Sequence, residues 1–191
     1  MHTIFDYNTL IIKEHVRFLK LNNVYEIFSE QNQKLGDIKE ETAGIVKFLK
    51  LTSLRKSLPF VIAYYNMSGQ QLLKLKRAFT FFLSKINVYQ NEQLVGYYKQ
   101  RFRIKPTFEI YDKNDKLIAN IKGNFIAWDF KIEDINGNII GGINKKWAGL
   151  AKELFTSADN YVIRFHGKVD ETTRRLIMSA AASLDMVYKE H

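Results

Sequence analysis

The stretch LIMSAAASLDMV, Leu176–Val187, decides the fold of this 191-residue chain. Wound as a helix, it carries apolar or small residues on every side, and no charge falls between Arg175 and Asp185. A helix that is hydrophobic all round is buried in protein or in lipid. Because the stretch is well short of the ~20 residues that cross a bilayer, we expect it to lie inside the folded protein.

The residues just before this stretch carry helix start signals. Asp170 can cap the N-terminus of a helix, and Glu171 suits the positive end of the helix dipole. With these signals in place, we predict a helix over Arg174–Tyr188.

Upstream of the helix, the chain repeats one pattern. Each copy has a short strand with alternating apolar residues, a polar turn of Asn, Asp, Gly or Ser, and a second strand rich in aliphatic residues. The turn residues supply the positive φ angles of a tight reversal, most clearly at Asn136-Gly137. The pattern predicts β-hairpins at Val24–Ile38, Ala63–Leu75, Asn87–Tyr98, Thr107–Ile121 and Asp129–Ile143.

A long antiparallel series of hairpins has two exposed edges, and closure into a barrel removes them. The hairpins and the end strands together give roughly ten to twelve strands, a barrel too wide to be filled by its own side chains. The C-terminal helix can fill that space. We therefore predict an all-β fold, a closed antiparallel barrel of about twelve strands around a central hydrophobic α-helix, formed by a single domain over residues 1–191.

The bulk composition is basic and free of cysteine. The formal charge is +9, from 29 basic and 20 acidic residues. Such an excess favours anionic partners such as lipid head groups, nucleic acid or acidic proteins, although it also serves solubility alone. The absence of cysteine excludes disulfides and thiolate metal sites and suits a reducing cytoplasm. With no signal-peptide pattern and no membrane-length apolar span, we expect a soluble or membrane-peripheral protein.

The stretch GGINKKWAGLAKELFTSADNYVIRF, Gly141–Phe165, resembles the phospholipid scramblase signature. Asn22–Thr42 and Leu94–Phe102 also look like that family, so the resemblance covers about residues 10 to 190. It implies the fold that scramblases share with tubby C-terminal-like and LURP-one-related proteins, a twelve-stranded barrel around a central C-terminal helix. The signature positions include Gly142, Trp147, Gly149, Phe155, Asp159, Asn160 and Phe165.

The sequence departs from the family in two ways. Animal scramblases carry a cysteine-rich run and a proline-rich N-terminal extension, so the resemblance implies a minimal member of the kind found in bacteria. In the family's proposed calcium segment, the first and last carboxylates are replaced here by Ser157 and Lys168, which leaves Asp159 and Asn160. Because calcium takes six to eight oxygens, usually with several carboxylates, we expect that this site is lost and that the protein needs no metal or other cofactor.

Two segments are candidates for binding anionic groups. Adjacent lysines in the signature loop can hold an anion without burial. The segment Val46–Phe60 alternates cations with apolar side chains and has no acid, so on a membrane each cation would contribute about 1 kcal/mol near anionic lipid. The predicted lipid- or anion-binding residues are Lys47, Lys50, Arg55, Lys56, Lys145 and Lys146.

Other features have both a functional and a structural interpretation. Trp147 suits a membrane interface, but we favour a tryptophan that covers one end of the barrel. Gly142 and Gly149 are interpreted as bends at a loop. A further set of cations forms one positive face if neighbouring strands align them, the alternative being ordinary outward residues: Lys74, Lys76, Arg77, Lys99, Arg101 and Arg103.

No catalytic constellation occurs in the chain, neither a Ser-His-Asp or Cys-His set nor a phosphate-cradling glycine loop, so we expect a protein that is not an enzyme. The leading hypothesis is a cytoplasmic protein, peripheral at the inner face of the membrane, that binds anionic phospholipid; lipid scrambling is implied by the resemblance only. One alternative is a protein-interaction or regulatory module that never touches lipid. A third is nucleic-acid binding, which a pI of about 9.5 favours but no recognition motif supports.

Overall fold

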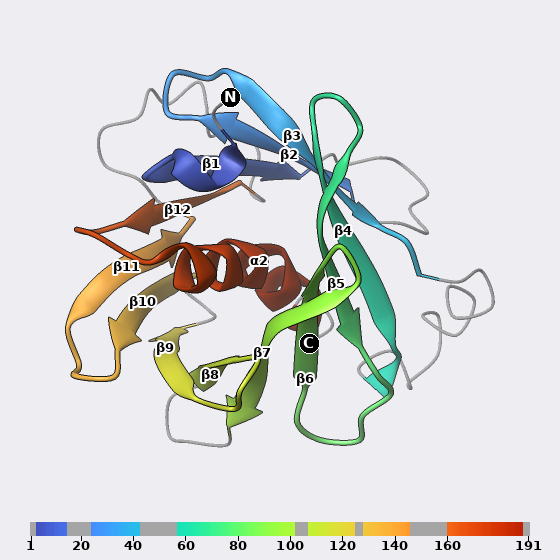
Figure 1. Ribbon diagram of the computed structural model, residues 1–191, viewed down its shortest axis with the longest axis vertical. Coiled ribbons are helices and arrows are strands. Elements are labelled where there is room, and N and C mark those ends of the chain that lie inside the picture. Colours follow the sequence, from blue (N-terminus) through green and yellow to red (C-terminus); the bar gives the residue numbers. More distant parts are fainter. Residues whose placement is uncertain are drawn as a thin grey trace.

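The computed structural model describes residues 3–14, 24–42, 57–101, 107–124, 128–145 and 160–188. In these ranges twelve antiparallel strands form one closed barrel, in which β1 (Thr9–Glu14) pairs with β12 (Tyr161–Phe165) to close the ring (Figure 1). The predicted fold class is therefore confirmed. The remaining strands are β2 (Val24–Ser29), β3 (Lys34–Glu40), β4 (Phe60–Asn66), β5 (Gln71–Arg77), β6 (Lys85–Gln90), β7 (Gln93–Arg101), β8 (Thr107–Asp112), β9 (Leu117–Asn124), β10 (Asp129–Asp134) and β11 (Ile139–Asn144).

The helix α2 (Glu171–Tyr188) lies among the strands, as Figure 1 shows, and a short 3-10 helix, η1 (Ile4–Asp6), precedes β1. Every residue of α2 from Leu176 to Leu184 is at most 2% exposed, as an apolar helix inside a barrel requires. The predicted cap is confirmed, because Asp170 Oδ1 accepts the backbone N–H of Thr173 at 3.0 Å. The helix begins at Glu171, three residues before the predicted Arg174. Among the described residues, no helix has the length and apolar character needed to span a membrane.

Two buried tyrosines attach α2 to the barrel wall. The Tyr64 hydroxyl donates to the carbonyl oxygens of Met178 and Ser179, each at 3.2 Å. The Tyr98 hydroxyl lies 2.7 Å from Ser179 Oγ. Burial raises the pKa of both phenols, because the interior cannot solvate a phenolate. The hydroxyl groups of both tyrosines are thus hydrogen-bonded to α2.

All five predicted hairpins are present, and each places one face of its strands toward the interior. In the β10–β11 hairpin, Asp134 Oδ1 accepts the backbone N–H groups of Asn136 and Asn138. Gly137 has φ +85°, the left-handed conformation that a glycine adopts without strain. The predicted turn is therefore present, with the expected positive φ at Gly137 but not at Asn136.

The strand directions give the barrel two different ends. The turn end carries the five short hairpin turns and the start of α2, where Thr172 and Arg175 share a cleft with turn residues Gln90 and Asp112. The loop end carries the connections β1–β2, β3–β4, β5–β6, β7–β8, β9–β10 and β11–β12.

Candidate anion-binding surface

The structure describes only some of the residues that the sequence predicted as sites. Lys145, Gly142, Asn160 and Phe165 are within the described residues. The remaining predicted residues lie outside the described ranges: Lys47, Lys50, Arg55, Lys56, Lys146, Trp147, Gly149, Phe155 and Asp159.

Lys145 is held against an aromatic ring. Its Nζ lies 4.5 Å from the ring centroid of Trp128, and its backbone N–H donates to the Trp128 carbonyl at 3.1 Å. Trp128 itself is only 9% exposed and stacks on Tyr161 at 6.0 Å. Trp128 therefore covers part of the loop end, the role that we expected of Trp147. The sequence contains one signal for this role: Trp128 stands two residues before the buried Phe130, the spacing of side chains on the same face of a strand.

The other described signature residues are structural. Gly142 lies inside β11, opposite Lys131 on one side and Arg164 on the other. The expected bend at Gly142 is therefore wrong, because the strand is paired on both sides there. Phe165 is 4% exposed and packs beneath the guanidinium of Arg174, whose Cζ lies 4.3 Å from the ring centroid.

The segment that resembles the family's calcium site does not fit that metal where it is described. Residues 160–168 contain no carboxylate, and Asn160 is buried in the wall of the barrel. Calcium needs several oxygen donors, usually including carboxylates. Across the described ranges, no group of three or more His, Cys, Asp or Glu side chains could hold a metal ion.

A cleft of about 540 Å³ lies at the turn end, bounded by η1 and by the β2–β3 and β4–β5 turns. Its walls include Ile4, Leu35 and Leu72. Lys34, the lysine at its rim, is held by the carboxylates of Glu26 and Asp37 at 2.7 and 2.9 Å, and both raise its pKa. A ligand pocket needs polar groups that point at the ligand, so this cleft is a weak candidate.

The adjacent strands β5, β6 and β7 gather cations on the outer face of the barrel. Strand alternation turns these side chains outward, and the register places them on neighbouring strands. The sequence grouped four of them and missed the fifth, Lys85, because strand register is not visible in a sequence. The outward cations are Lys74 and Lys76 of β5, Lys85 of β6, and Lys99 and Arg101 of β7.

Arg77 does not belong to this face, although the sequence placed it there. It follows Lys76 directly and so points to the opposite side of the strand. Its guanidinium donates to the carbonyl of Leu58 at 2.5 Å and lies over the ring of Phe60 at 4.4 Å. Only 3% of the residue is exposed. Arg103, the last residue of the predicted set, lies outside the described residues.

Three of the five outward cations have acidic partners. Lys74 and Lys76 each approach the Glu92 carboxylate at 3.5 Å, and their charges lower the pKa of Glu92. Arg101 Nε donates to Glu109 at 2.6 Å, a hydrogen bond that raises the pKa of Arg101. These ion pairs leave Lys85 and Lys99 as the cations most open to an external anion.

Lys85 and Lys99 are directly opposite each other in the β6–β7 register, and both are exposed. Neither forms an ion pair with any described residue. Lys85 Nζ lies 3.9 Å from the ring centroid of Tyr97, which stacks on Tyr111 at 4.9 Å. On its other side Lys99 is opposite Glu109, but that carboxylate is bound by Arg101 at 2.6 Å. Like charges in directly opposed positions repel each other. An anion that contacts both ammonium groups would remove that repulsion, so we call these two residues the Lys85–Lys99 pair and treat it as the candidate site.

Comparison with known proteins identifies relatives of the whole chain. A family model described as "Scramblase" matches residues 1–191. The chain is 23% identical over 195 residues to altered inheritance rate of mitochondria protein 25 of Saccharomyces cerevisiae, a match that covers 85% of this chain and 60% of that protein. It is 25% identical over 203 residues to phospholipid scramblase 2 of Bos taurus, covering 95% of this chain and 68% of that protein. This chain thus spans less than two thirds of the yeast relative's length.

A solved structure supports the fold. The X-ray structure of an Arabidopsis thaliana protein superposes with a TM-score of 0.51 and 14% sequence identity, covering 96% of this chain and 92% of that one. At this identity the likeness concerns the fold alone, and it agrees with the tubby-like and LURP-one-related barrel implied by the sequence.

Proposed function

Because this chain belongs to the scramblase family, we propose that it binds the surface of membranes that contain anionic phospholipid. The Lys85–Lys99 pair carries this proposal, since two exposed lysines with no acidic partner among the described residues offer a phosphate group two ammonium donors. The formal charge of +9 supports it, because a basic protein is drawn toward an anionic surface. Binding of this kind needs no catalytic residue and no metal.

The filled interior also favours a surface activity. Side chains of α2 occupy the space within the strands, and its residues from Leu176 to Leu184 are buried. A ligand must therefore meet the outer face or one end of the barrel. A scrambling activity is suggested only by the names of the relatives, whereas the proposal of binding is supported by the cations on the outer face.

A nucleic-acid partner fits this face less well. Proteins that hold single strands stack bases on open aromatic rings. Tyr97, beside the lysine pair, is only 8% exposed because Lys85 lies over its ring and Tyr111 stacks on it. The tyrosine ring beside the lysine pair is thus already covered by the protein's own side chains, and the open rings nearby are the phenylalanines of residues 79–82 rather than a ring on the strand face itself.

Sedimentation with vesicles tests the proposal. The parent chain should pellet with phosphatidylcholine vesicles that contain phosphatidylserine, should stay in solution with phosphatidylcholine alone, and should be released by salt. Since each cation near anionic lipid contributes about 1 kcal/mol, replacing both lysines should weaken binding by about 30-fold. The test variant is Lys85→Gln/Lys99→Gln, and its matched control is Lys113→Gln/Lys116→Gln, which removes two exposed lysines from the β8–β9 turn at the turn end.

A second variant tests the sequence-predicted segment. Charge reversal at Lys47, Lys50, Arg55 and Lys56 should release the protein from the same vesicles without unfolding it. A parent chain that stays in solution with phosphatidylserine vesicles would contradict membrane binding and would favour the protein-interaction module instead.

A further inference from the structure

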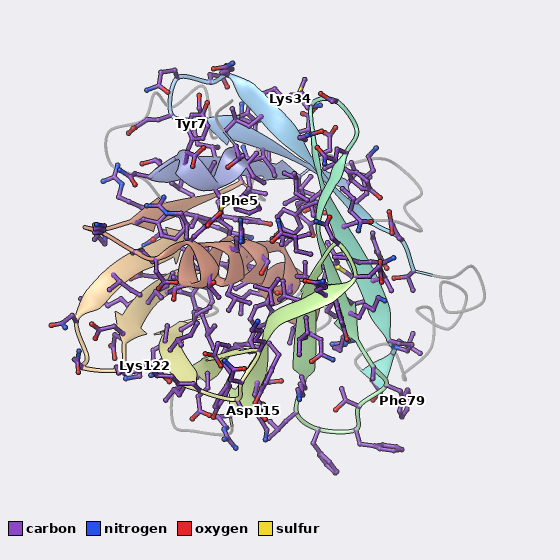
Figure 2. The ribbon with its side chains drawn as sticks, in the orientation of Figure 1. Phe5, Tyr7, Lys34, Phe79, Asp115 and Lys122 are labelled. Atoms are coloured by element: carbon purple, nitrogen blue, oxygen red, sulfur yellow. The ribbon has the colours of Figure 1, made fainter. Side chains whose placement is uncertain are left out.

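The β5–β6 loop, residues 78–84, concentrates exposed apolar side chains. Of the eight large hydrophobic residues that are exposed among the described ranges, four lie within residues 79–83. Figure 2 shows Phe79 at the outer edge of the molecule, on this connection. The exposed fractions are 47% for Phe79, 78% for Phe81, 93% for Phe82 and 39% for Leu83. Scattered exposed residues are ordinary, whereas a contiguous apolar cluster marks a contact surface.

The base of the β5–β6 loop is fixed to the barrel by hydrogen bonds. The Thr80 backbone N–H donates to the Ser57 carbonyl at 3.0 Å. The Ser84 N–H donates to Gln100 Oε1 at 3.1 Å, and the Gln100 N–H donates to the Ser84 carbonyl at 2.8 Å. The fold therefore holds the loop in place while its phenylalanines point away from the core.

The tip of the loop also has internal order. The Thr80 hydroxyl donates to the Leu83 carbonyl at 2.8 Å, which closes a tight turn across the tip. The rings of Phe79 and Phe81 meet edge to face, with centroids 5.0 Å apart. The Phe82 ring, next to these two in the chain, is 93% exposed, so the tip is an apolar projection from the barrel.

Basic side chains stand on both sides of this projection. Lys76 is the penultimate residue of β5, and Lys85 is the first residue of β6, so the two flank the loop in the chain. Lys99 is the cross-strand partner of Lys85. An apolar tip beside exposed lysines is complementary to a layer with apolar chains beneath anionic head groups.

We propose that the β5–β6 loop is a membrane anchor, which inserts Phe81 and Phe82 into the interfacial layer of a phospholipid bilayer while the Lys85–Lys99 pair contacts anionic head groups. This rests on the proposed membrane binding and names the part of the surface that enters the lipid. A bilayer accepts a convex apolar projection, because its chains close around the inserted rings. The neighbouring cations select anionic lipid as the occupant.

The cysteine-free sequence allows a direct test of insertion. Phe82→Cys places the single thiol of the chain at the tip, where an environment-sensitive fluorophore can be attached. Met67→Cys is the matched control, because Met67 is 61% exposed but lies in the β4–β5 turn at the turn end. On phosphatidylserine-containing vesicles, the probe at position 82 should shift to the blue and be quenched by a quencher carried on the lipid chains, while the probe at position 67 should not change.

A second measurement uses the unlabelled chain. Phe81→Ser/Phe82→Ser should lower the vesicle partition coefficient by about 10-fold or more, because two rings lose their transfer from water. The difference should persist at high salt, where screening removes most of the lysine contribution. Ile135→Ser/Ile139→Ser, which removes two exposed apolar residues of the β10–β11 hairpin, should bind as the parent does.

The outcomes separate the two proposals. If the parent does not bind phosphatidylserine vesicles, membrane binding itself is wrong and the anchor with it. If the parent binds but the probe at position 82 stays in water and the double serine variant binds equally well, only the anchor is wrong. A probe at position 82 that shifts without lipid, in proportion to protein concentration, would also overturn the anchor, because the loop would then dock on a second copy of the chain.

Discussion

The contact between Tyr98 and Ser179 gives a quantitative test of the helix position. The Tyr98 hydroxyl of β7 lies 2.7 Å from Ser179 Oγ of α2, and both residues are at most 1% exposed. The two residues are 81 positions apart in the sequence, so their contact depends on the tertiary fold. An interaction energy between them therefore exists only if α2 lies inside the barrel with this face toward β7.

The size of the effect follows from the hydrogen bonds. Tyr98→Phe removes one buried hydrogen bond and leaves Ser179 Oγ still donating to the Leu176 carbonyl at 2.9 Å, so we expect a loss of about 1 kcal/mol. Ser179→Ala leaves the Tyr98 hydroxyl beside Ser183 alone and should cost about as much. The double variant should be less destabilised than the sum of the single variants by about 1 kcal/mol, because the shared bond is lost only once.

Urea unfolding of the four proteins, followed by tryptophan fluorescence, measures this coupling. Trp128 is buried against Tyr161 and should report loss of the barrel. The control cycle pairs Tyr98→Phe with Ser29→Ala, a buried serine of β2 that lies across the barrel from β7. This control should be additive. Coupling below about 0.3 kcal/mol in the Tyr98–Ser179 cycle would refute the position of α2, since that is the scatter of independent sites.

Three further predictions concern the interior, a turn and alkaline pH. Ala181→Asp places a carboxylate at a position with 0% exposure and should destabilise the fold by more than about 4 kcal/mol, so a thermal melt like that of the parent would contradict a buried helix. Gly137→Ala forces a side chain onto φ +85° and should cost about 1 kcal/mol in urea unfolding, although no atom lies within 4 Å of the added carbon; an unchanged midpoint would mean that the turn relaxes. Burial, and then a carboxylate partner, raises the pKa of Tyr65 and of Tyr97 to about 12, above the usual value of about 10 in the unfolded chain. The stability that these phenols contribute should therefore be complete below about pH 10 and be lost as the pH rises toward 12, which absorbance at 295 nm and urea midpoints would follow; native phenols that all ionise near pH 10 would contradict it.

The fold could be predicted because its signals are local. Alternation with a period of two, broken by residues such as Asn136-Gly137, marks hairpins whatever the rest of the chain does. The helix is similarly marked by its own composition, and a helix without a polar face can be stable only inside the protein. Its N-cap at Asp170 was predicted as well, because that contact is local. The start of the helix was placed three residues late because Thr172 and Thr173 lack strong helix propensity.

The surface could be predicted only in part, because it depends on register. A β-bulge between Val88 and Tyr89 shifts the β6–β7 pairing, and Lys85 meets Lys99 as a result of where that shift falls. Trp128 adopts φ +49°, which no local signal predicts for a tryptophan, and this conformation accompanies its position over the loop end. These contacts belong to the closed barrel rather than to any one segment.

The chemistry of the turns gives the two ends of the barrel different charged groups. Asp112 and Asp134 stand at the turn end because their carboxylates accept the backbone N–H groups that a tight turn leaves open. Glu92, in the β6–β7 turn, adds to the negative charge there. Turn formation thus places carboxylates at one end, while Lys85 and Lys99 lie on strand residues nearer the other. Lys113 and Lys116 offset these carboxylates at the turn end, and Glu92 is paired with Lys74 and Lys76. If the proposed membrane binding holds, its direction is therefore set by the Lys85–Lys99 pair and the exposed phenylalanines of the β5–β6 loop rather than by repulsion of the turn end.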